Sequence, residues 1–297
     1  MTKNYKNFKV DNRMNDAFAK FIFANEKRKQ LTLDLINGFF ELEGTAVIQD
    51  LEFSDRELDR EVEEGKGVVL DVVGRSCDGT LVNVEIQLEQ FQEMGKRTLY
   101  YWSQLYHRRL KKGEEYPELA RTVTLNLLDY RLFKDEEWPE YHSCFAVLNT
   151  KDMQHRLTNN LEIHFVELPK WKHDGSRQMK RLERWLMYLS SKTTDEERRM
   201  LAMEDENIRT AMEAEKEFAK DPLLITAYEQ HQKYLWDKHA REAFVREEGE
   251  AIGYEKGKAE GIAEGKVEAL KAFVAVLRAS GKSEEEIAEI CKKIKSM

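Results

Sequence analysis

The sequence contains little proline and cysteine. Four prolines occur in 297 residues, so we expect few extended linkers and a predominance of helix. The three cysteines, Cys77, Cys144 and Cys291, are widely spaced, odd in number and without a Cys-x-x-Cys pair. This pattern argues against a disulfide framework or a zinc knuckle, and it favours a reducing cytoplasm.

Signals for export and for membrane insertion are also missing. The N-terminal segment has neither an apolar signal core nor an Arg- and Ser-rich transit pattern. No apolar run reaches the roughly eighteen residues that a spanning helix needs. The sequence therefore predicts a cytoplasmic protein without a membrane partner.

Charge is abundant, but its sign is wrong for a passive phosphate binder. Charged residues make up 35% of the chain and the net charge is −8. Proteins that bind nucleic acid by charge alone are usually basic. A metal-dependent nuclease remains compatible with these values, because a divalent cation reverses the local charge of an acidic site.

Hydrophobic spacing predicts a mixed α/β plan that gives way to helices alone. Helices are expected over 15–40, 89–111, 177–190, 193–220, 223–244, 241–277 and 284–294. Strands are expected over 47–53, 68–73, 81–88, 122–130, 145–148 and 163–168, with a turn at Asp78-Gly79. We divide the chain into an α/β domain over 1–190, a helical extension over 191–240 and a glycine-repeat helix with a terminal hairpin over 241–297.

Two carboxylates and an amide lie on adjacent predicted strands. Asp71 interrupts an apolar run, where a carboxylate is costly to bury unless it is paired or binds a metal. Glu85 and Gln87 are two residues apart and so leave the same face of their strand. Pairing as a hairpin would bring all three into one patch. The alternative, with Asp71 at a sheet edge and Glu85 in solvent, remains open.

The carboxylates of such a patch could bind a divalent metal ion. Carboxylate oxygens suit Mg²⁺, which keeps several waters and also takes a substrate phosphate. The ion makes a bound water more nucleophilic and stabilises the charge that develops on the phosphate. The pattern therefore indicates metal-assisted hydrolysis of a phosphate ester.

Several pieces of the chain, in order, resemble the PD-(D/E)xK nuclease superfamily and, more narrowly, the Rpn family of recombination-promoting nucleases and transposase-like proteins. The pieces are 16–23, 66–73, 82–87, Arg97 with Tyr101, 113–116, 123–127, 164–168 and the glycine repeats. The resemblance covers nearly the whole chain. It implies a restriction-endonuclease-like αβββαβ core, cleavage of DNA phosphodiester bonds, and a divalent metal, Mg with Mn or Ca as alternatives.

The resemblance also implies roles for single residues. Asp71 and Glu85 correspond to metal ligands, and with Gln87 they form the catalytic set. Gln87 stands where the superfamily has lysine; it can hydrogen-bond water but supplies no charge. Asp16, in the first helix, is a further candidate metal ligand, or else an acidic residue favoured by the helix dipole.

Candidate DNA contacts follow in the next helix. Arg97 and Tyr101 are four residues apart and share one helix face. They are candidates for contact with the scissile phosphate, although simple packing explains them equally well. A basic cluster that includes Lys96, Arg108 and Arg109 is the candidate contact for the DNA backbone; a solvated charged face is the alternative.

Five glycines recur every four residues in the tail, at Gly249, Gly253, Gly257, Gly261 and Gly265. Their neighbours favour helix, whereas each interior glycine costs ~1 kcal/mol relative to alanine. Close packing against a second copy would offset that cost, which predicts a homodimer or higher oligomer; a flexible helix is the alternative. Near the end, Ser283 and Glu286 have the spacing of a capping box.

These features leave three hypotheses for function. The first is a metal-dependent DNA endonuclease linked to recombination or mobile elements. The second is a catalytically weak or inactive nuclease-like protein that binds DNA or partners, which Gln87 and the acidic net charge favour. The third is a structural protein that acts through its long helices. Retention of both Asp71 and Glu85 favours the enzyme.

Overall fold

The computed structural model describes residues 8–41, 47–53, 68–76, 81–88, 93–108, 119, 121–173 and 178–295. The first elements are α1 (Asp16–Phe23), the 3-10 helix η1 (Glu26–Arg28), α2 (Lys29–Phe39), β1 (Ile48–Phe53), β2 (Val68–Ser76), β3 (Leu81–Leu88), α3 (Met94–Arg108) and β4 (Arg121–Leu128). Then come β5 (His142–Phe145), β6 (Leu148–Asn149), β7 (Asp152–Arg156), β8 (Leu161–Glu167), the 3-10 helix η5 (Leu168–Lys170), α4 (Arg181–Leu189), α5 (Asp195–Glu204), α6 (Glu206–Phe218), α7 (Pro222–Ala279) and α8 (Glu284–Lys295). The predicted mixed α/β class is confirmed.

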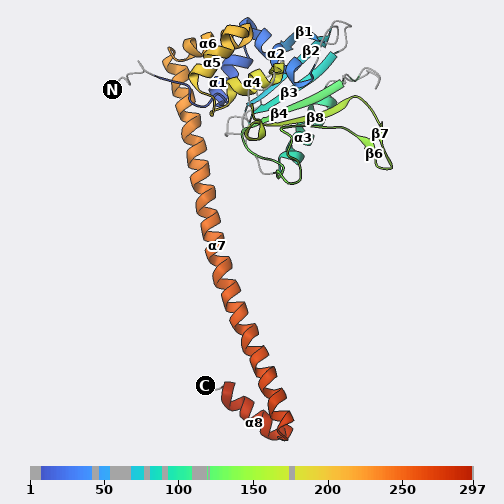
Figure 1. The fold of residues 1–297 in the computed structure, drawn as a ribbon, viewed down its shortest axis with the longest axis vertical. Coiled ribbons are helices and arrows are strands. Elements are labelled where there is room, and N and C mark those ends of the chain that lie inside the picture. Colours follow the sequence, from blue (N-terminus) through green and yellow to red (C-terminus); the bar gives the residue numbers. More distant parts are fainter. Residues whose placement is uncertain are drawn as a thin grey trace. The chain divides into compact units, whose positions relative to one another are not determined.

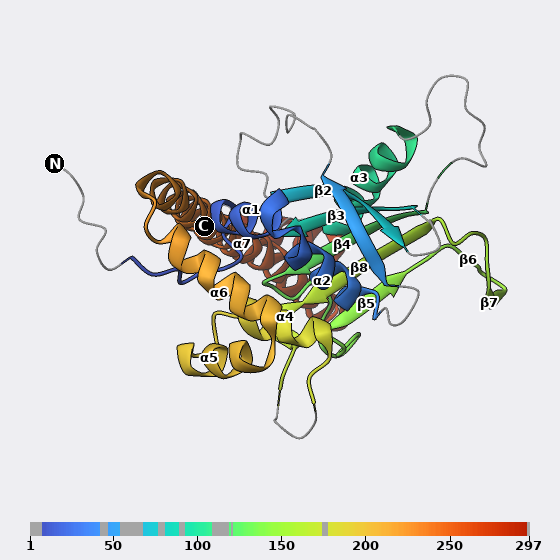
Figure 2. The ribbon, with the colours of Figure 1, turned by 90° about the horizontal axis from the view of Figure 1, so that it is seen from above.

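A six-stranded sheet organises the α/β part, in the order β1-β2-β3-β4-β8-β5 (Figure 1, with β5 labelled in Figure 2). The first three strands are antiparallel neighbours. After α3 the chain returns so that β4 pairs with β3 in parallel, and β8 then pairs with β4 in parallel. The edge strand β5 is antiparallel to β8.

The two faces of the sheet differ in chemistry, as β4 shows. Val123, Leu125 and Leu127 are buried in the main hydrophobic core, together with residues of α1, α2, α4 and α6. The alternating residues Thr124 and Asn126 are also buried but belong to the opposite face, where α3 lies. The ribbon views show α3 on the other side of the sheet from these helices (Figure 1, Figure 2). The face beneath α3 is therefore the polar one.

The main core extends beyond the sheet into the later helices. Leu201 of α5, Phe218 of α6 and Tyr228 of α7 are buried in the same cluster as Phe18 and Trp185. Burying a large apolar side chain contributes about 1.5–3 kcal/mol. Helices from the predicted 191–240 extension thus stabilise the same body as the strands.

Two helices predicted as continuous are broken, and the predictions of 15–40 and 193–220 as single helices were wrong. A polar side chain begins a new helix at each break. Asn25 accepts a hydrogen bond from the backbone N–H of Lys27, and Asp205 accepts from the N–H groups of Asn207 and Ile208. Each satisfies donors that have no partner within the helix, which makes a restart favourable.

The strand predicted over 145–148 was also wrong. Phe145 instead ends β5, where its ring packs against Phe133 and Phe165 with centroids 5.7 and 5.8 Å apart. The short hairpin of β6 and β7 was not predicted, because β7 is exposed along its whole length and lacks an alternating apolar pattern. The predicted turn at Asp78-Gly79 and both ends of the 89–111 helix lie outside the described residues.

The chain divides into two compact units, Met1–Tyr234 and Leu235–Met297. The second unit contains most of α7, a single 58-residue helix that runs without interruption through position 241, and α8. The predicted capping box is present, since the Glu286 N–H donates to Oγ of Ser283 and the Ser283 N–H donates to the Glu286 carboxylate. Among the described residues, no helix combines the length and hydropathy of a bilayer span.

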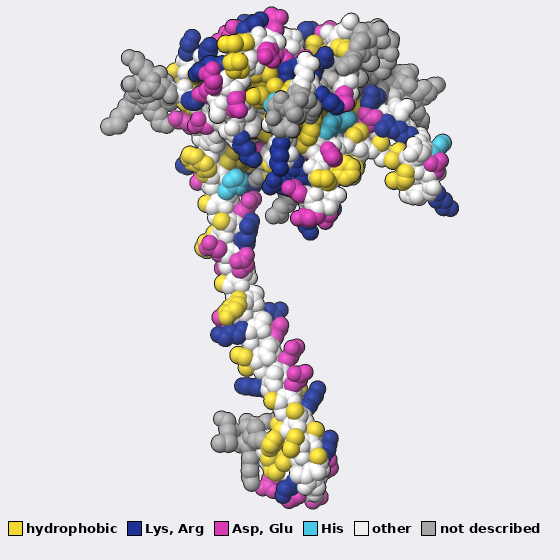
Figure 3. All heavy atoms as spheres, in the orientation of Figure 1, with side chains coloured by type: hydrophobic (Ala, Val, Ile, Leu, Met, Phe, Trp, Pro, Cys, Tyr) yellow, Lys and Arg dark blue, Asp and Glu magenta, His cyan; other side chains and the backbone are white. Residues whose placement is uncertain are grey.

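The glycine stripe lies on an open part of α7. A Cβ atom added to any of the five glycines would meet no heavy atom within 4 Å, apart from the helix's own nearby backbone. Figure 3 shows side chains of both charge signs interspersed along the visible face of the helix. Within the described monomer, therefore, no neighbour packs against the stripe.

Candidate active site

The predicted hairpin places the candidate catalytic positions next to one another. In the antiparallel pair of β2 and β3, Asp71 is directly opposite Glu85 and Val69 is directly opposite Gln87. Opposed residues of such a pair share a face of the sheet, with Cβ atoms about 4.5–5.5 Å apart. Asp71, Glu85 and Gln87 therefore occupy neighbouring positions on one face.

The adjoining strand β4 extends this patch with buried polar groups. Thr124 pairs with Glu85, and Asn126 pairs with Gln87. The amide of Asn126 donates to Oγ1 of Thr98 on α3 at 3.1 Å and to the carbonyl of His164 at 2.9 Å. The Asp71–Glu85 patch, defined as Asp71, Glu85, Gln87, Thr124 and Asn126, thus lies on the face of the sheet that carries α3.

One buried atom in the Asp71–Glu85 patch lacks a hydrogen-bond partner. The side chain of Thr124 has no exposed surface, and its Oγ1 makes no hydrogen bond in the part of the chain that the structure describes. Buried hydroxyl groups nearly always have a partner, which is often a water or an ion when it is not protein. A hydroxyl at this position fits a site that binds water or a phosphate oxygen.

The donor set of the patch also fits a divalent cation. Two carboxylate positions directly opposite each other offer the oxygen ligands that Mg²⁺ prefers, and Mg²⁺ commonly uses only one or two carboxylates. Amide and hydroxyl groups next to them can hold its waters by hydrogen bonds. Asp71 and Glu85 could therefore hold such a cation, and their role as its ligands stays a prediction.

The predicted DNA contacts lie on α3 or just beyond it. Lys96 is exposed and forms an ion pair with Glu93 at 2.7 Å. Arg97 is half-buried on the same helix, and Tyr101 and Arg108 follow within it. Arg109 lies outside the described residues. Lys96 and Arg97 thus belong to the helix that covers the sheet face of the Asp71–Glu85 patch, and their role in DNA binding stays a prediction.

Asp16 lies in the first turn of α1, a helix on the apolar face of the sheet. Its Oδ1 is 3.6 Å from Nε2 of His231 in α7, and its backbone N–H donates to the other ring nitrogen of that histidine at 3.3 Å. These contacts explain an acidic residue here without a metal. Its role as a metal ligand stays a prediction.

Sequence reasoning missed Thr98, Thr124 and Asn126. The two β4 residues had a detectable signal, since Thr122, Thr124 and Asn126 alternate with apolar residues in a strand that is buried on both faces. Such a period indicates a polar face. Thr98 carried no comparable signal, because its contact with Asn126 depends on how α3 packs.

A separate polar cluster occupies the other face of the sheet, at the β5–β8 edge. Its members are His142, Cys144, Glu162 and His164. Burial and the neighbouring His164 lower the pKa of His142 to about 4. Burial opposes ionisation of Glu162, but hydrogen bonds from His164, Arg156 and Arg121 outweigh it and lower the pKa of that carboxyl to about 2. At neutral pH the cluster therefore contains a neutral imidazole at His142 and an ionised carboxylate.

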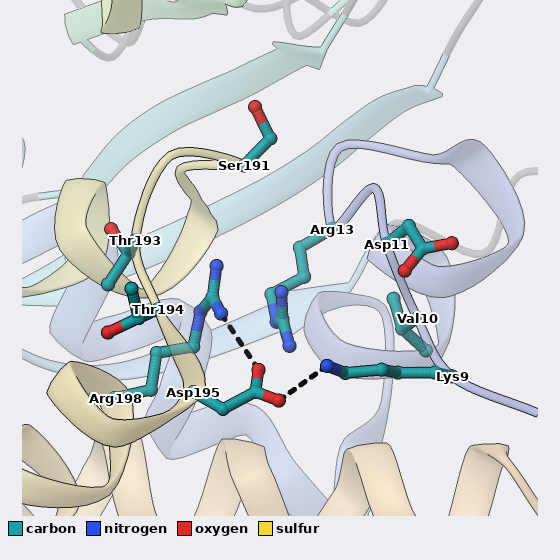
Figure 4. A pocket seen from close by; sticks show the side chains of 9 residues that line it. All are labelled: Lys9, Val10, Asp11, Arg13, Ser191, Thr193, Thr194, Asp195 and Arg198. Atoms are coloured by element: carbon teal, nitrogen blue, oxygen red, sulfur yellow. Dashed lines mark hydrogen bonds and ion pairs between the residues drawn. The ribbon is translucent and has the colours of Figure 1, made fainter.

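A pocket of about 210 Å³ lies between the N-terminal segment and the start of α5 (Figure 4). Four of its charged groups, Lys9, Arg13, Asp195 and Arg198, are used in ion pairs. Asp195 pairs with Lys9 and Arg198, and Arg13 donates two hydrogen bonds to Glu215 at 2.6 and 2.9 Å. None of the predicted catalytic or DNA-binding residues lines it, so we assign it a structural role.

Comparison with known proteins gave one result. Searches of curated proteins and of solved structures returned no significant match. The family described as PD-(D/E)XK nuclease family transposase matches residues 13–243, more than half of the chain and the whole of the six-stranded sheet. The chain belongs to the PD-(D/E)XK nuclease family transposases.

Proposed function

We propose that the protein is a metal-dependent DNA endonuclease that hydrolyses phosphodiester bonds. The observation that carries the proposal is the register that sets Asp71 directly opposite Glu85 on the polar face of the sheet. Family membership supports a phosphodiester hydrolase with a nucleic-acid substrate. The helix–three strands–helix–strand order of α2, β1–β3, α3 and β4 supports the αβββαβ core expected of such an enzyme.

Four residues of the patch have a proposed task. Asp71 and Glu85 hold a divalent metal, Mg in our proposal with Mn or Ca as alternatives, which supplies a more nucleophilic water and charge stabilisation when bound. Gln87 orients the attacking water through its amide, and Thr124 donates a hydrogen bond to that water or to a phosphate oxygen. Lys96, Arg97, Tyr101, Arg108 and Arg109 contact the DNA. We place the activity in the cytoplasm and link it to recombination or to mobile elements.

The test is cleavage of supercoiled plasmid by the purified full chain. We expect conversion to nicked circles with Mg²⁺, Mn²⁺ or Ca²⁺, and none with EDTA. A single-stranded substrate and a linear duplex run in parallel would separate endonuclease from exonuclease activity. Degradation of the linear duplex alone, with the circle untouched, would contradict the endonuclease.

Gln87 provides a second prediction. Replacing it with lysine should retain or raise the nicking rate, because an ammonium group at this position restores the charge common in the superfamily. A hydrogen bond that involves a charged group contributes about 1.5–3 kcal/mol, so a gain of roughly tenfold to a hundredfold is the upper expectation. The measurement compares the initial nicking rates of wild type, Gln87→Lys and Gln87→Ala at the same Mg²⁺ concentration. Complete loss in a folded Gln87→Lys variant would mean that the neutral amide itself is required.

The alternative function is a catalytically weak or inactive nuclease-like protein that binds DNA or partners. Gln87 and the net charge of −8 favour it. The two functions differ in a simple pair of measurements, DNA binding by gel shift and DNA cleavage with metal. Salt-sensitive binding without cleavage in any of the three metals would support the alternative.

We also propose that the protein forms a homodimer or higher oligomer through α7. The open glycine stripe supports this, since five interior glycines weaken helix by several kcal/mol in total (~1 kcal/mol each) unless a close neighbour compensates. Exposed apolar side chains on the same helix, among them Phe244, Ile252 and Ile262, offer further area for a partner helix.

Replacing Gly253, Gly257 and Gly261 with leucine should raise helix propensity yet weaken association, because leucine side chains hold two backbones apart. Light scattering at matched concentrations measures the oligomer. The control carries leucine at Ala251, Glu255 and Ala259, which are also exposed but lie off the stripe. A monomeric wild type would favour the flexible-helix alternative. Equal assembly of the glycine variant and the control variant would favour it too.

A further inference from the structure

Three metal-binding side chains converge at the β5–β8 edge. The Sγ atom of Cys144 is 3.5 Å from Nε2 of His164, and that nitrogen is 3.6 Å from a carboxylate oxygen of Glu162. One ligand atom from each residue lies within 4.8 Å of the others. Glu162 and His164 are buried, whereas Cys144 is exposed. Solvent can therefore reach the cluster from the cysteine side.

Strand pairing fixes this arrangement. Cys144 is directly opposite His164 in the antiparallel pair of β5 and β8, and Glu162 precedes His164 by two residues on the same face. In the parallel pair with β4, Glu162 and His164 stand beside Val123 and Leu125, which belong to the main core. The cluster is thus on the opposite face of the sheet from the Asp71–Glu85 patch and independent of it.

Two of the separations, from Cys144 to His164 and from His164 to Glu162, match those in a tetrahedral transition-metal site. Zinc binds sulfur at about 2.3 Å and nitrogen or oxygen at about 2.0–2.2 Å, so its ligand atoms lie roughly 3.3–3.6 Å apart. A thiolate, an imidazole and a carboxylate form a mixed set that suits zinc, whereas Mg²⁺ and Ca²⁺ take oxygen ligands almost alone. We propose that Cys144, Glu162 and His164 form a zinc site with one position open to water or to a partner's side chain.

The imidazole of His164 is already oriented for this role. Its Nδ1 is 3.0 Å from Nε2 of His142, so a hydrogen bond joins the two rings. While no metal is bound, Nε2 of His164 donates to Glu162. In the other tautomer the proton is on Nδ1 and is donated to His142, so the lone pair of Nε2 faces Cys144 and Glu162. A metal-binding histidine is commonly held in this way through its other ring nitrogen. The rings of Phe39 and Phe40, at the end of α2, pack edge-on against His142 and His164 respectively.

Two arginines limit the strength of the site. Arg156 donates to one oxygen of Glu162 at 2.6 Å, and Arg121 pairs with the other. Each carboxylate oxygen keeps a further lone pair for a metal. The two positive charges nevertheless oppose a divalent cation, so zinc binds less tightly here than in a closed site with four protein ligands.

The full-length protein is titrated with Co²⁺, a coloured substitute for zinc, and then with Zn²⁺. We expect one equivalent of Co²⁺ to give thiolate-to-cobalt charge-transfer absorption that Zn²⁺ abolishes by displacement. Cys144→Ser should remove this absorption and weaken zinc binding at least tenfold. Zinc should raise the melting temperature of wild type but not of Cys144→Ser, because the ligands come from two strands that only the folded state brings together.

Three controls make the result specific. Cys77→Ser and Cys291→Ser remove the other two thiols and should keep the absorption, and Asp71→Ala should keep it because that residue belongs to the other face. His164→Gln, a second ligand variant, should lose zinc binding as Cys144→Ser does. Retention of the thiolate absorption in Cys144→Ser, its loss in Cys291→Ser, or the absence of saturable binding in wild type would each overturn the proposal.

Discussion

Replacing Asp71 or Glu85 with alanine is expected to abolish metal-dependent nicking of supercoiled DNA. Each variant removes one of two carboxylates that occupy directly opposed positions on β2 and β3. A metal contributes several kcal/mol of transition-state stabilisation in such reactions, and about 4 kcal/mol corresponds to a thousandfold in rate. We therefore expect the initial nicking rate at saturating Mg²⁺ to fall about a thousandfold or more.

The fold should survive these changes, which separates a catalytic effect from a structural one. Circular dichroism and the melting temperature of both variants should match those of wild type. Asp135→Ala removes an exposed carboxylate that pairs with the surface residue Arg131, and this variant should nick at the wild-type rate. Normal nicking by either folded variant, Asp71→Ala or Glu85→Ala, would refute the site assignment.

Replacing Lys170 with methionine is expected to destabilise the protein by about 3–5 kcal/mol, the usual cost of leaving one partner of a buried ion pair uncompensated. The side chains of Lys170 and Glu167 are 1% and 0% exposed, and their charged atoms are 2.9 Å apart. The Glu167 carboxylate also accepts hydrogen bonds from the backbone N–H groups of Leu132 and Phe133. Lys170 in turn donates to the carbonyl of Trp138. The ion pair thus holds the loop between β4 and β5 against the end of β8.

Urea unfolding of matched variants measures the effect. Lys172→Met changes an exposed lysine two residues away and should leave the free energy of unfolding within roughly 0.5 kcal/mol of wild type. The double variant Glu167→Gln/Lys170→Met should regain part of the loss, because glutamine still accepts from the two N–H groups and carries no charge. Equal stability of Lys170→Met and wild type would mean that the pair contributes little.

The strands of the candidate site could be predicted from local sequence alone. β2 and β3 follow from β-branched residues and alternation, and the turn signal at Asp78-Gly79 between them indicates an antiparallel hairpin. Once the hairpin is assumed, Asp71 lies opposite Glu85 if the two strands pair in one particular register. The structure has this register. The same reasoning could have predicted Asn126 as a residue of the site, because polar residues alternate with apolar ones in β4.

Features that do not follow from hydrophobic spacing could not be predicted in this way. Both segments have continuous helical spacing, so the spacing does not indicate a break. The helices break at Asn25 and Asp205 because each side chain caps the helix that follows it. The cluster of Cys144, Glu162 and His164 exists only because an edge strand pairs with β8. Nothing in the spacing of these residues along the chain indicates that their ligand atoms meet.

Plasmid nicking by the wild-type protein, with metal supplied, removed and restored, tests most directly whether the protein is a metal-dependent endonuclease. Supercoiled DNA is incubated with purified protein in Mg²⁺, in Mn²⁺, in Ca²⁺, in EDTA, and in EDTA followed by excess metal. An Asp71→Ala preparation purified in the same way reports any contaminating nuclease. We expect nicked circles with at least one metal, none in EDTA and recovery when metal is restored. Nicking that persists in EDTA, or intact plasmid with all three metals and a folded protein, would contradict it.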